Sequence, residues 1–299
     1  MNAANLPDFE RAATGSHFFQ HGNGLRQHYL DVGRGPPVVM LHGNPSWCYY
    51  WRHLCNGLAD RYRCIVPDHI GMGWSDKPDS RRYGYRLQDR INDLDALLAR
   101  VVPEGPVTLA VHDWGGMIGM GWALLHPERV SRVIFLNTAA FPKPPSKRLP
   151  ASLGLVRNTS LGAWLVEKLN FFAWGATWLG VTRPMSPAVK AAYLSPYDTP
   201  ANRIGTLRFV QDIPLQPGEA GYSTLVEAEA LLARFQELPV FIGWGLKDFV
   251  FDHHFLARFR ELLPNAEVHA LADAGHYVLE DAHERLVPAI RSFLDRHGG

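Results

Sequence analysis

The sequence predicts an α/β protein in which a mostly parallel sheet, flanked by helices, is interrupted by a helical insertion. Strand-like apolar runs alternate with helical patterns through the first half of the chain, as in successive βαβ units. The alternation stops near residue 139, where Trp, Phe, Leu and Pro become frequent, and resumes near residue 236. We therefore expect a core domain of residues 1–138 and 236–299 and a helical cap domain of residues 139–235.

Each expected element follows from its apolar pattern. Short apolar runs bounded by turn residues predict strands at 36–43, 62–69, 107–113, 132–138, 239–245 and 266–272. Apolar residues recurring at helical intervals predict helices at 48–60, 85–101, 115–126, 253–262 and 282–296.

The composition excludes several classes of function. A formal net charge of +1 gives no overall basic excess for nucleic acid or an anionic membrane. The longest uncharged stretch of the apolar region, 169–182, has 14 residues, and a spanning helix needs roughly 20. The N-terminus lacks the apolar run of a signal peptide, and Cys48, Cys55 and Cys64 have no metal-ligand spacing. We expect no membrane-spanning segment, reduced cysteines, a cytoplasmic location, and no metal or other cofactor.

The segment VTLAVHDWGGMIG places Asp113 between a buried strand and a helix, with Gly115 two residues later. This pattern predicts a nucleophile elbow, a sharp turn that exposes one side chain at the carboxyl end of the sheet. The helix that begins at Trp114 adds backbone N–H donors near that side chain. We therefore predict that Asp113 is the nucleophile rather than a simple helix cap.

An aspartate in this position determines the class of reaction. A serine that attacked an sp³ carbon would form an ether, which water does not readily cleave. An aspartate forms an ester, whose carbonyl remains open to hydrolysis. An aspartate nucleophile therefore suits reactions whose covalent intermediate must be resolved after attack on an alkyl carbon, which a serine could not complete.

The remaining groups of the predicted site follow strands in chain order. Asp248 follows the strand at 239–245, and His276 follows the strand at 266–272. We expect His276 to act as the base and Asp248 to orient it. In HGNP (42–45), Asn44 is predicted to offer a backbone N–H with that of Trp114, and both side chains offer neutral donors to a departing anion.

Other polar groups receive structural interpretations. His42 and His112 lie at strand ends. Asp252 precedes a helix and is predicted to be its N-cap rather than a metal ligand with His253 and His254, because adjacent helix positions point in different directions. Glu280 is a reserve candidate for the acid.

The motifs HGNPSW, DHIGMGWSDKP, HDWGGMIG, WGLKDFVFD and DAGHYVLEDAHE resemble those of the haloalkane dehalogenase family over almost the whole chain. The resemblance implies an α/β-hydrolase fold with the cap inserted after the sixth strand. It also implies Asp113 as nucleophile, His276 as base, Asp248 as acid, and Asn44 with Trp114 as the pair that holds the leaving halide. The halide ligands and the position of the acid resemble the third subgroup of that family.

Within that group, HDWGGMIGMGWA, LNTAAF and NRIGTLRFVQDIPLQP resemble the β-lactone decarboxylases of bacterial long-chain olefin biosynthesis. That resemblance implies conversion of cis-dialkyl β-lactones to cis-alkenes and CO₂, and association with enzymes that form the lactone. His112 stands where dehalogenases of the subgroup more often carry Gln, which disfavours dehalogenation. The sequence leaves attack on the β-carbon and attack on the carbonyl equally open.

Three alternatives remain at this stage: haloalkane dehalogenation, epoxide hydrolysis, and a binding role without catalysis. Epoxide hydrolysis needs proton-donating tyrosines, for which Tyr193, Tyr197 and Tyr222 are the candidates. The apolar side chains of the insertion are expected to line a pocket for a small hydrophobic substrate with alkyl chains. They are Leu153, Leu155, Trp164, Leu165, Phe171, Phe172, Trp174 and Trp178.

Overall fold

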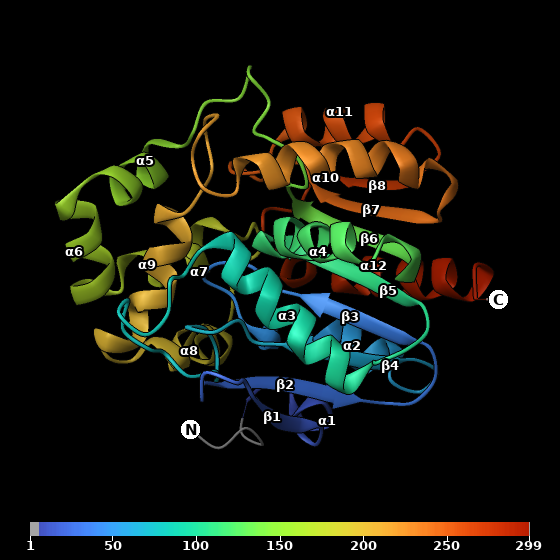
Figure 1. Ribbon diagram of the computed structural model, residues 1–299, viewed down its shortest axis with the longest axis horizontal. Coiled ribbons are helices and arrows are strands. Elements are labelled where there is room, and N and C mark those ends of the chain that lie inside the picture. Colours follow the sequence, from blue (N-terminus) through green and yellow to red (C-terminus); the bar gives the residue numbers. More distant parts are fainter. Residues whose placement is uncertain (1–5, 299) are drawn as a thin grey trace.

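The computed structural model describes residues 6–298 and contains an eight-stranded sheet with helices on both faces (Figure 1). The strand order is β1-β2-β4-β3-β5-β6-β7-β8, and β2 runs antiparallel to both of its neighbours while the other pairs are parallel. The strands are β1 (Ser16–Gln20), β2 (Arg26–Val32), β3 (Pro37–Leu41), β4 (Arg63–Pro67), β5 (Val107–Asp113), β6 (Val130–Thr138), β7 (Val240–Gly245) and β8 (Glu267–Leu271). The predicted α/β architecture is confirmed.

The apolar patterns did not identify the two N-terminal strands. β1 is a sheet-edge strand, and four of its five residues are exposed, so it lacks the apolar run that marks the other strands. Counting both strands makes β6 the sixth, and the helical segment begins after it, as the family resemblance implied.

Both faces of the sheet are buried, which explains the nearly continuous apolar runs of its central strands. Along β3, Val38 and Met40 face one hydrophobic cluster while Val39 and Leu41 face the other. The first cluster includes helices α1 (Glu10–Ala13), α2 (Arg52–Leu58) and α12 (Val278–Arg296). The second includes α3 (Leu87–Val101), α4 (Trp114–Leu125), α10 (Tyr222–Arg234) and α11 (His253–Leu262).

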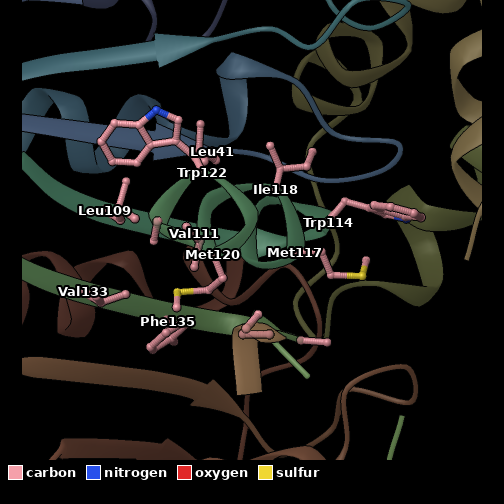
Figure 2. Close-up of a cluster of buried hydrophobic side chains, with 14 of the residues drawn as sticks. Leu41, Leu109, Val111, Trp114, Met117, Ile118, Met120, Trp122, Val133 and Phe135 are labelled. Atoms are coloured by element: carbon pink, nitrogen blue, oxygen red, sulfur yellow. The ribbon is translucent and has the colours of Figure 1, made fainter. Parts of the chain in front are cut away.

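Helix α4 lies directly over the centre of the sheet (Figure 2). Its Ile118 and Met120 are fully buried in the cluster that contains Val111 of β5 and Phe135 of β6. A Cβ atom on Gly119 would lie 2.9 Å from a Val111 methyl group, so a glycine permits this close approach. The packing fixes the start of α4, and with it the end of β5, relative to the sheet.

The chain between β6 and β7, which we call the cap segment (residues 139–235), contains helices and turns but no strand among its described residues. Its first helices are α5 (Ala151–Asn158), α6 (Ser160–Leu169), α7 (Phe171–Leu179), α8 (Pro187–Leu194) and α9 (Ile204–Gln211). They gather at one end of the molecule, while α10 returns to the sheet and packs on α4 (Figure 1). Short 3₁₀ turns cover Cys48–Trp51, Pro127–Arg129, Ser195–Tyr197, Ala201–Arg203 and Phe235–Glu237. Among residues 6–298, no helix is both long and apolar enough to cross a bilayer.

A buried ion pair joins the cap segment to the core. Arg90 of α3 and Asp212, which follows α9, are almost fully buried, and Arg90 Nη1 lies 3.1 Å from Asp212 Oδ2. The Arg90 guanidinium also stacks on the Phe209 ring, 3.8 Å from its centroid. Arg90 Nε and Nη2 have no hydrogen-bond partner among the described residues. Asp212 therefore provides most of the negative charge that offsets the cost of burying the Arg90 cation.

We expect Asp212→Asn to lower the free energy of unfolding by about 3–5 kcal/mol, because it leaves the Arg90 charge buried and unpaired. Urea unfolding followed by circular dichroism measures the change. The matched control is Asp79→Asn, which removes the partner of the exposed Arg81 and should not measurably change stability. Equal effects of the two substitutions would show that the buried pair does not hold the cap segment in place.

Candidate active site

The predicted nucleophile lies at a strained turn. Asp113 ends β5 with φ +51° and ψ −123°, and α4 begins at the next residue. A positive φ is costly for a residue with a side chain and persists only where its surroundings enforce it. Thr138 Oγ1 donates to the Asp113 carbonyl at 2.5 Å, and a Cβ on Gly115 would lie 2.0 Å from the Leu41 carbonyl oxygen. These contacts build the nucleophile-elbow geometry that the sequence predicted.

Backbone N–H groups hold the Asp113 carboxylate. Asp113 Oδ1 accepts a hydrogen bond from the Asn44 backbone N–H at 2.6 Å. Burial raises the pKa of Asp113, while His276 and the backbone N–H groups of Asn44 and Trp114 act in the opposite direction. The second oxygen, Oδ2, faces His276 Nε2 at 3.7 Å.

His276 and Asp248 form a direct pair. His276 Nδ1 donates to Asp248 Oδ2 at 2.8 Å, because a carboxylate oxygen is an acceptor. Asp248 Oδ1 accepts from the backbone N–H groups of Val250 and Phe251. Burial opposes protonation of His276, but Asp248 and then Asp113 outweigh it, and the net result is a raised pKa for His276. Asp113 and Asp248 are 135 residues apart in the sequence. The fold brings both carboxylates to the two ring nitrogens of His276.

Asn137, which the residue patterns did not single out, helps to orient Asp248. Asn137 Nδ2 donates to Asp248 Oδ2 at 3.0 Å and to the Gly245 carbonyl, and Asn137 Oδ1 accepts from the Gly245 N–H. It has φ +32° at the carboxyl end of β6. The sequence did contain a signal for this role, because Asn137 is a polar residue at the carboxyl end of a strand, as the residues of the predicted site are.

His112 anchors the backbone that carries the base. Its Nε2 donates to the His276 carbonyl oxygen at 2.9 Å, since a carbonyl oxygen is only an acceptor. Burial lowers the pKa of His112 well below its ordinary value, so it is neutral. Its strand-end position was predicted, but its contact with the His276 segment was not.

A second buried carboxylate, Asp68, fixes the loop that carries Asn44. Its Oδ1 accepts from the Cys48 N–H at 2.7 Å, and its Oδ2 accepts from His28 Nδ1 and the Trp74 N–H. Burial alone would raise the pKa of Asp68, but its hydrogen bonds and the nearby histidines lower it to about 2. Asp68 therefore stays ionised and ties three segments together.

Asn44 and Trp114 both line the cavity that contains Asp113 and His276. The Asn44 side-chain amide donates to the Thr206 carbonyl oxygen at 3.0 Å, so one of its two amide hydrogens is already bonded to the cap segment. Asn44 thus keeps a second amide hydrogen, and Trp114 has an indole N–H, as further donors among the residues that line the cavity.

The cavity is lined mainly by apolar side chains from both parts of the chain. Of the eight apolar residues expected to line it, Leu153, Phe171 and Phe172 do so. The expectation was wrong for Leu155, Trp164, Leu165, Trp174 and Trp178, which do not line it and of which all but Leu165 are exposed. Helical spacing gives a side chain's angular position but not whether that face meets the cavity or the outside.

The reserve acid has another role. Glu280 accepts from Arg52 Nη1 and Nη2 and from the Tyr193 hydroxyl, so it is not a partner of His276. The Tyr197 hydroxyl donates to the Ser46 carbonyl oxygen. Tyr193, Tyr197 and Tyr222 do not line the cavity, so the tyrosine donors that epoxide hydrolysis requires are not in place.

Among residues 6–298, two side-chain groups bring metal-type ligand atoms within 4.8 Å of one another, His28 with Cys48 and Asp68, and Asp252 with His253 and His254. The second grouping differs from the expectation that adjacent side chains would diverge. Asp252 Oδ1 accepts from the His254 N–H, which confirms Asp252 as the N-cap of α11, and Oδ2 accepts from Lys147 Nζ at 2.8 Å. With both oxygens of each carboxylate already engaged, neither group presents a free ligand set.

Comparison with known proteins places this geometry in a family. Residues 36–283 match the alpha/beta hydrolase fold family. The chain is 57% identical over 281 residues to the cis-3-alkyl-4-alkyloxetan-2-one decarboxylase of Xanthomonas campestris, covering 92% of this chain and 94% of that protein. The protein of the same name from Shewanella oneidensis is 52% identical, with 93% of this chain and 87% of that protein covered.

Dehalogenases are more distant relatives. Haloalkane dehalogenase 2 of Mycobacterium bovis is 29% identical over the full length of both chains. The crystal structure of a haloalkane dehalogenase from Agrobacterium tumefaciens superposes with a TM-score of 0.84 at 26% identity, covering 95% of this chain and 97% of that one. The chain therefore belongs to the α/β-hydrolase fold family and, within it, to the family of the cis-3-alkyl-4-alkyloxetan-2-one decarboxylases.

Proposed function

We propose that this enzyme converts cis-dialkyl β-lactones into cis-alkenes and CO₂, with Asp113 as the nucleophile. The observation that carries the proposal is a buried carboxylate, with one oxygen held and the other facing His276, at the base of an apolar cavity. An apolar cavity suits two alkyl chains, and 57% identity to a named oxetanone decarboxylase supports this substrate class.

The hydrogen bonds of Asp113 favour attack on the β-carbon over attack on the carbonyl. Attack on a carbonyl creates an oxyanion that needs aligned N–H donors. The backbone N–H of Asn44 already binds Asp113 Oδ1, the oxygen that becomes the carbonyl of an ester formed through Oδ2. Substitution at an sp³ carbon creates no such oxyanion. An N–H donor that already binds the nucleophile is therefore compatible with an alkyl-ester intermediate.

The proposed reaction balances without water. Asp113 Oδ2 forms a bond to the β-carbon as the ring C–O bond breaks, which releases a carboxylate on the neighbouring carbon. The electrons of the bond to that carboxylate then form the C=C bond, CO₂ leaves, and the C–O bond to Asp113 breaks to restore its carboxylate. Backside attack inverts the β-carbon, and anti elimination then places both alkyl groups on the same side, giving a cis-alkene from a cis-lactone.

The other groups act on charge and orientation in this scheme. His276, held by Asp248 and with a raised pKa, supplies a positive charge beside the carboxylates that form in each step. Asn44 and Trp114 supply neutral donors at the cavity wall for the carboxylate that the ring releases. The cap segment, which we propose as a separate domain of residues 139–235, closes the cavity around the alkyl chains.

Haloalkane dehalogenation is the second candidate, because the same Asn44 and Trp114 donors suit a leaving halide. In that reaction His276 must be neutral and must activate water to hydrolyse the ester on Asp113. The two reactions thus share the first step and differ in how the ester is resolved.

We also propose a cytoplasmic location and association with the enzymes that form the β-lactone. Cys48, Cys55 and Cys64 are buried free thiols, which suits a reducing compartment. The association rests on the family resemblance, and co-purification of those enzymes with this chain from its native cells tests it.

Gas chromatography of the products tests the proposed function. The enzyme is incubated with a synthetic cis-dialkyl β-lactone and, in parallel, with 1-bromobutane. We expect a cis-alkene from the lactone and little bromide from 1-bromobutane. Bromide and butanol with an unreacted lactone would establish a dehalogenase instead, and no product from either substrate would contradict both assignments.

The pH dependence of alkene formation tests whether a general base is needed. If the ester on Asp113 is resolved by elimination, His276 can stay protonated, and kcat should stay level as the pH falls past 6.5, the ordinary pKa of histidine. Activity should then fall only where Asp113 takes up a proton, above its ordinary pKa of 3.8 because burial raises it. A loss of kcat with falling pH at the raised pKa of His276 would instead show that a neutral base is required.

A further inference from the structure

The outer surface of the first three cap helices exposes large apolar side chains. The α5–α7 apolar surface, as we call it, is defined by Leu155 of α5, Leu161, Trp164 and Leu169 of α6, and Trp174, Trp178 and Leu179 of α7, which are 36–68% exposed. Isolated exposed apolar residues are common, but a group that includes three tryptophans on two successive helices is a candidate interaction site. These helices lie at the end of the molecule opposite the C-terminus (Figure 1).

Helical spacing places these side chains in rows. On α6, Leu161, Trp164 and Lys168 follow one another at intervals of three and four residues. On α7, Trp174 and Trp178 are four residues apart, with ring centroids at 6.0 Å. Each helix thus turns a coherent apolar stripe outward rather than toward the core.

The α5–α7 apolar surface continues into the cavity of the candidate active site. Phe171 and Leu179 line the cavity that contains Asp113, and both are also exposed to the outside, at 44% and 68%. Phe171 lies one helical turn before Trp174. An apolar molecule on this surface would therefore contact Phe171 and Leu179, which also line the cavity that contains Asp113.

The side chains around this surface carry a basic excess. Residues 139–191 contain seven lysine and arginine side chains and one acidic side chain, Glu167, although the whole chain carries a net charge of only +1. Lys147, Arg157 and Arg183 are paired with acidic side chains of other segments, whereas Arg148, Lys168 and Lys190 have no such partner among the described residues. Lys168 lies within the apolar stripe of α6 and is exposed. Lys190 Nζ lies over the Trp178 ring. Tryptophan with neighbouring lysine and arginine is the composition of a surface that lies at an anionic lipid interface.

We infer that the α5–α7 apolar surface binds the face of an anionic lipid bilayer, with the tryptophans inserted among the headgroups and the cavity opening toward the lipid. The basic surroundings favour an anionic bilayer over a second copy of this chain, because two such surfaces would bring like charges together. The inference goes beyond the proposed function, since binding is measured without substrate.

Vesicle sedimentation tests the inference on the full chain. Vesicles of phosphatidylglycerol and phosphatidylcholine in equal amounts are compared with vesicles of phosphatidylcholine alone. We expect binding to the anionic vesicles that weakens with added salt, and a loss of about tenfold or more in the double variant Trp174→Ser/Trp178→Ser. The matched control Phe18→Ser/Leu125→Ser, which removes two exposed apolar side chains outside the cap segment, should bind as the unaltered chain does.

Three outcomes would overturn the inference: no binding to anionic vesicles, binding that the tryptophan substitutions leave unchanged, or an equal loss in the control variant. Size-exclusion chromatography separates the protein alternatives. A dimer that the tryptophan substitutions convert to a monomer, without vesicle binding, would assign the surface to a second copy. Turnover of a short-chain lactone in solution should be the same in the tryptophan variant, so failure of this inference and failure of the proposed function are distinguishable.

Discussion

The backbone of Asp113 is the constraint on which the rest of the site depends. A left-handed conformation at a non-glycine residue is held between β5 and α4 by close contacts that leave no room for a side chain at Gly43 or Gly115. A Cβ on Gly43 would lie 2.0 Å from Asp113 Oδ1, so the glycine lets the neighbouring N–H of Asn44 reach the carboxylate. The turn thus exposes the proposed nucleophile to the cavity and leaves its Oδ2 facing His276. Several buried polar groups hold the partners of this turn in position.

Those partners are secured by buried polar groups that do not bond Asp113 Oδ2. Asp68 ties down the loop of Asn44, His112 holds the backbone of His276, and Asn137 fixes Asp248. Such groups are costly to bury without hydrogen bonds. Each of them here bonds a segment that carries a catalytic candidate, although His112 Nδ1 has no partner among the described residues. The division between groups that react and groups that position explains why so many polar side chains lie in the core beneath an apolar cavity.

The central sheet and the order Asp113, Asp248, His276 were predictable because they follow from local patterns: a buried run, a turn, and a polar residue at its carboxyl end. β1 was missed because an exposed edge strand has no such run. The roles of Asn137 and Asp68 depend on contacts between distant segments, which no local pattern contains. Helical periodicity likewise did not distinguish Phe171, which lines the cavity, from Trp174, which faces outward. The net charge of +1 gave no indication that residues 139–191 are basic, because a sum over the whole chain does not show where the charges lie.

The central claim is that the free oxygen of Asp113 bonds to the substrate. Asp113→Asn is nearly isosteric, and its amide oxygen still accepts from the Asn44 N–H, so the fold should be preserved and circular dichroism should confirm it. The measurement is the rate of cis-alkene formation from a cis-dialkyl β-lactone by this variant and by the unaltered enzyme. We predict a loss of about 10⁴-fold or more in kcat, because an amide is a poor nucleophile. Alkene formation at an undiminished rate by a folded Asp113→Asn variant would contradict it.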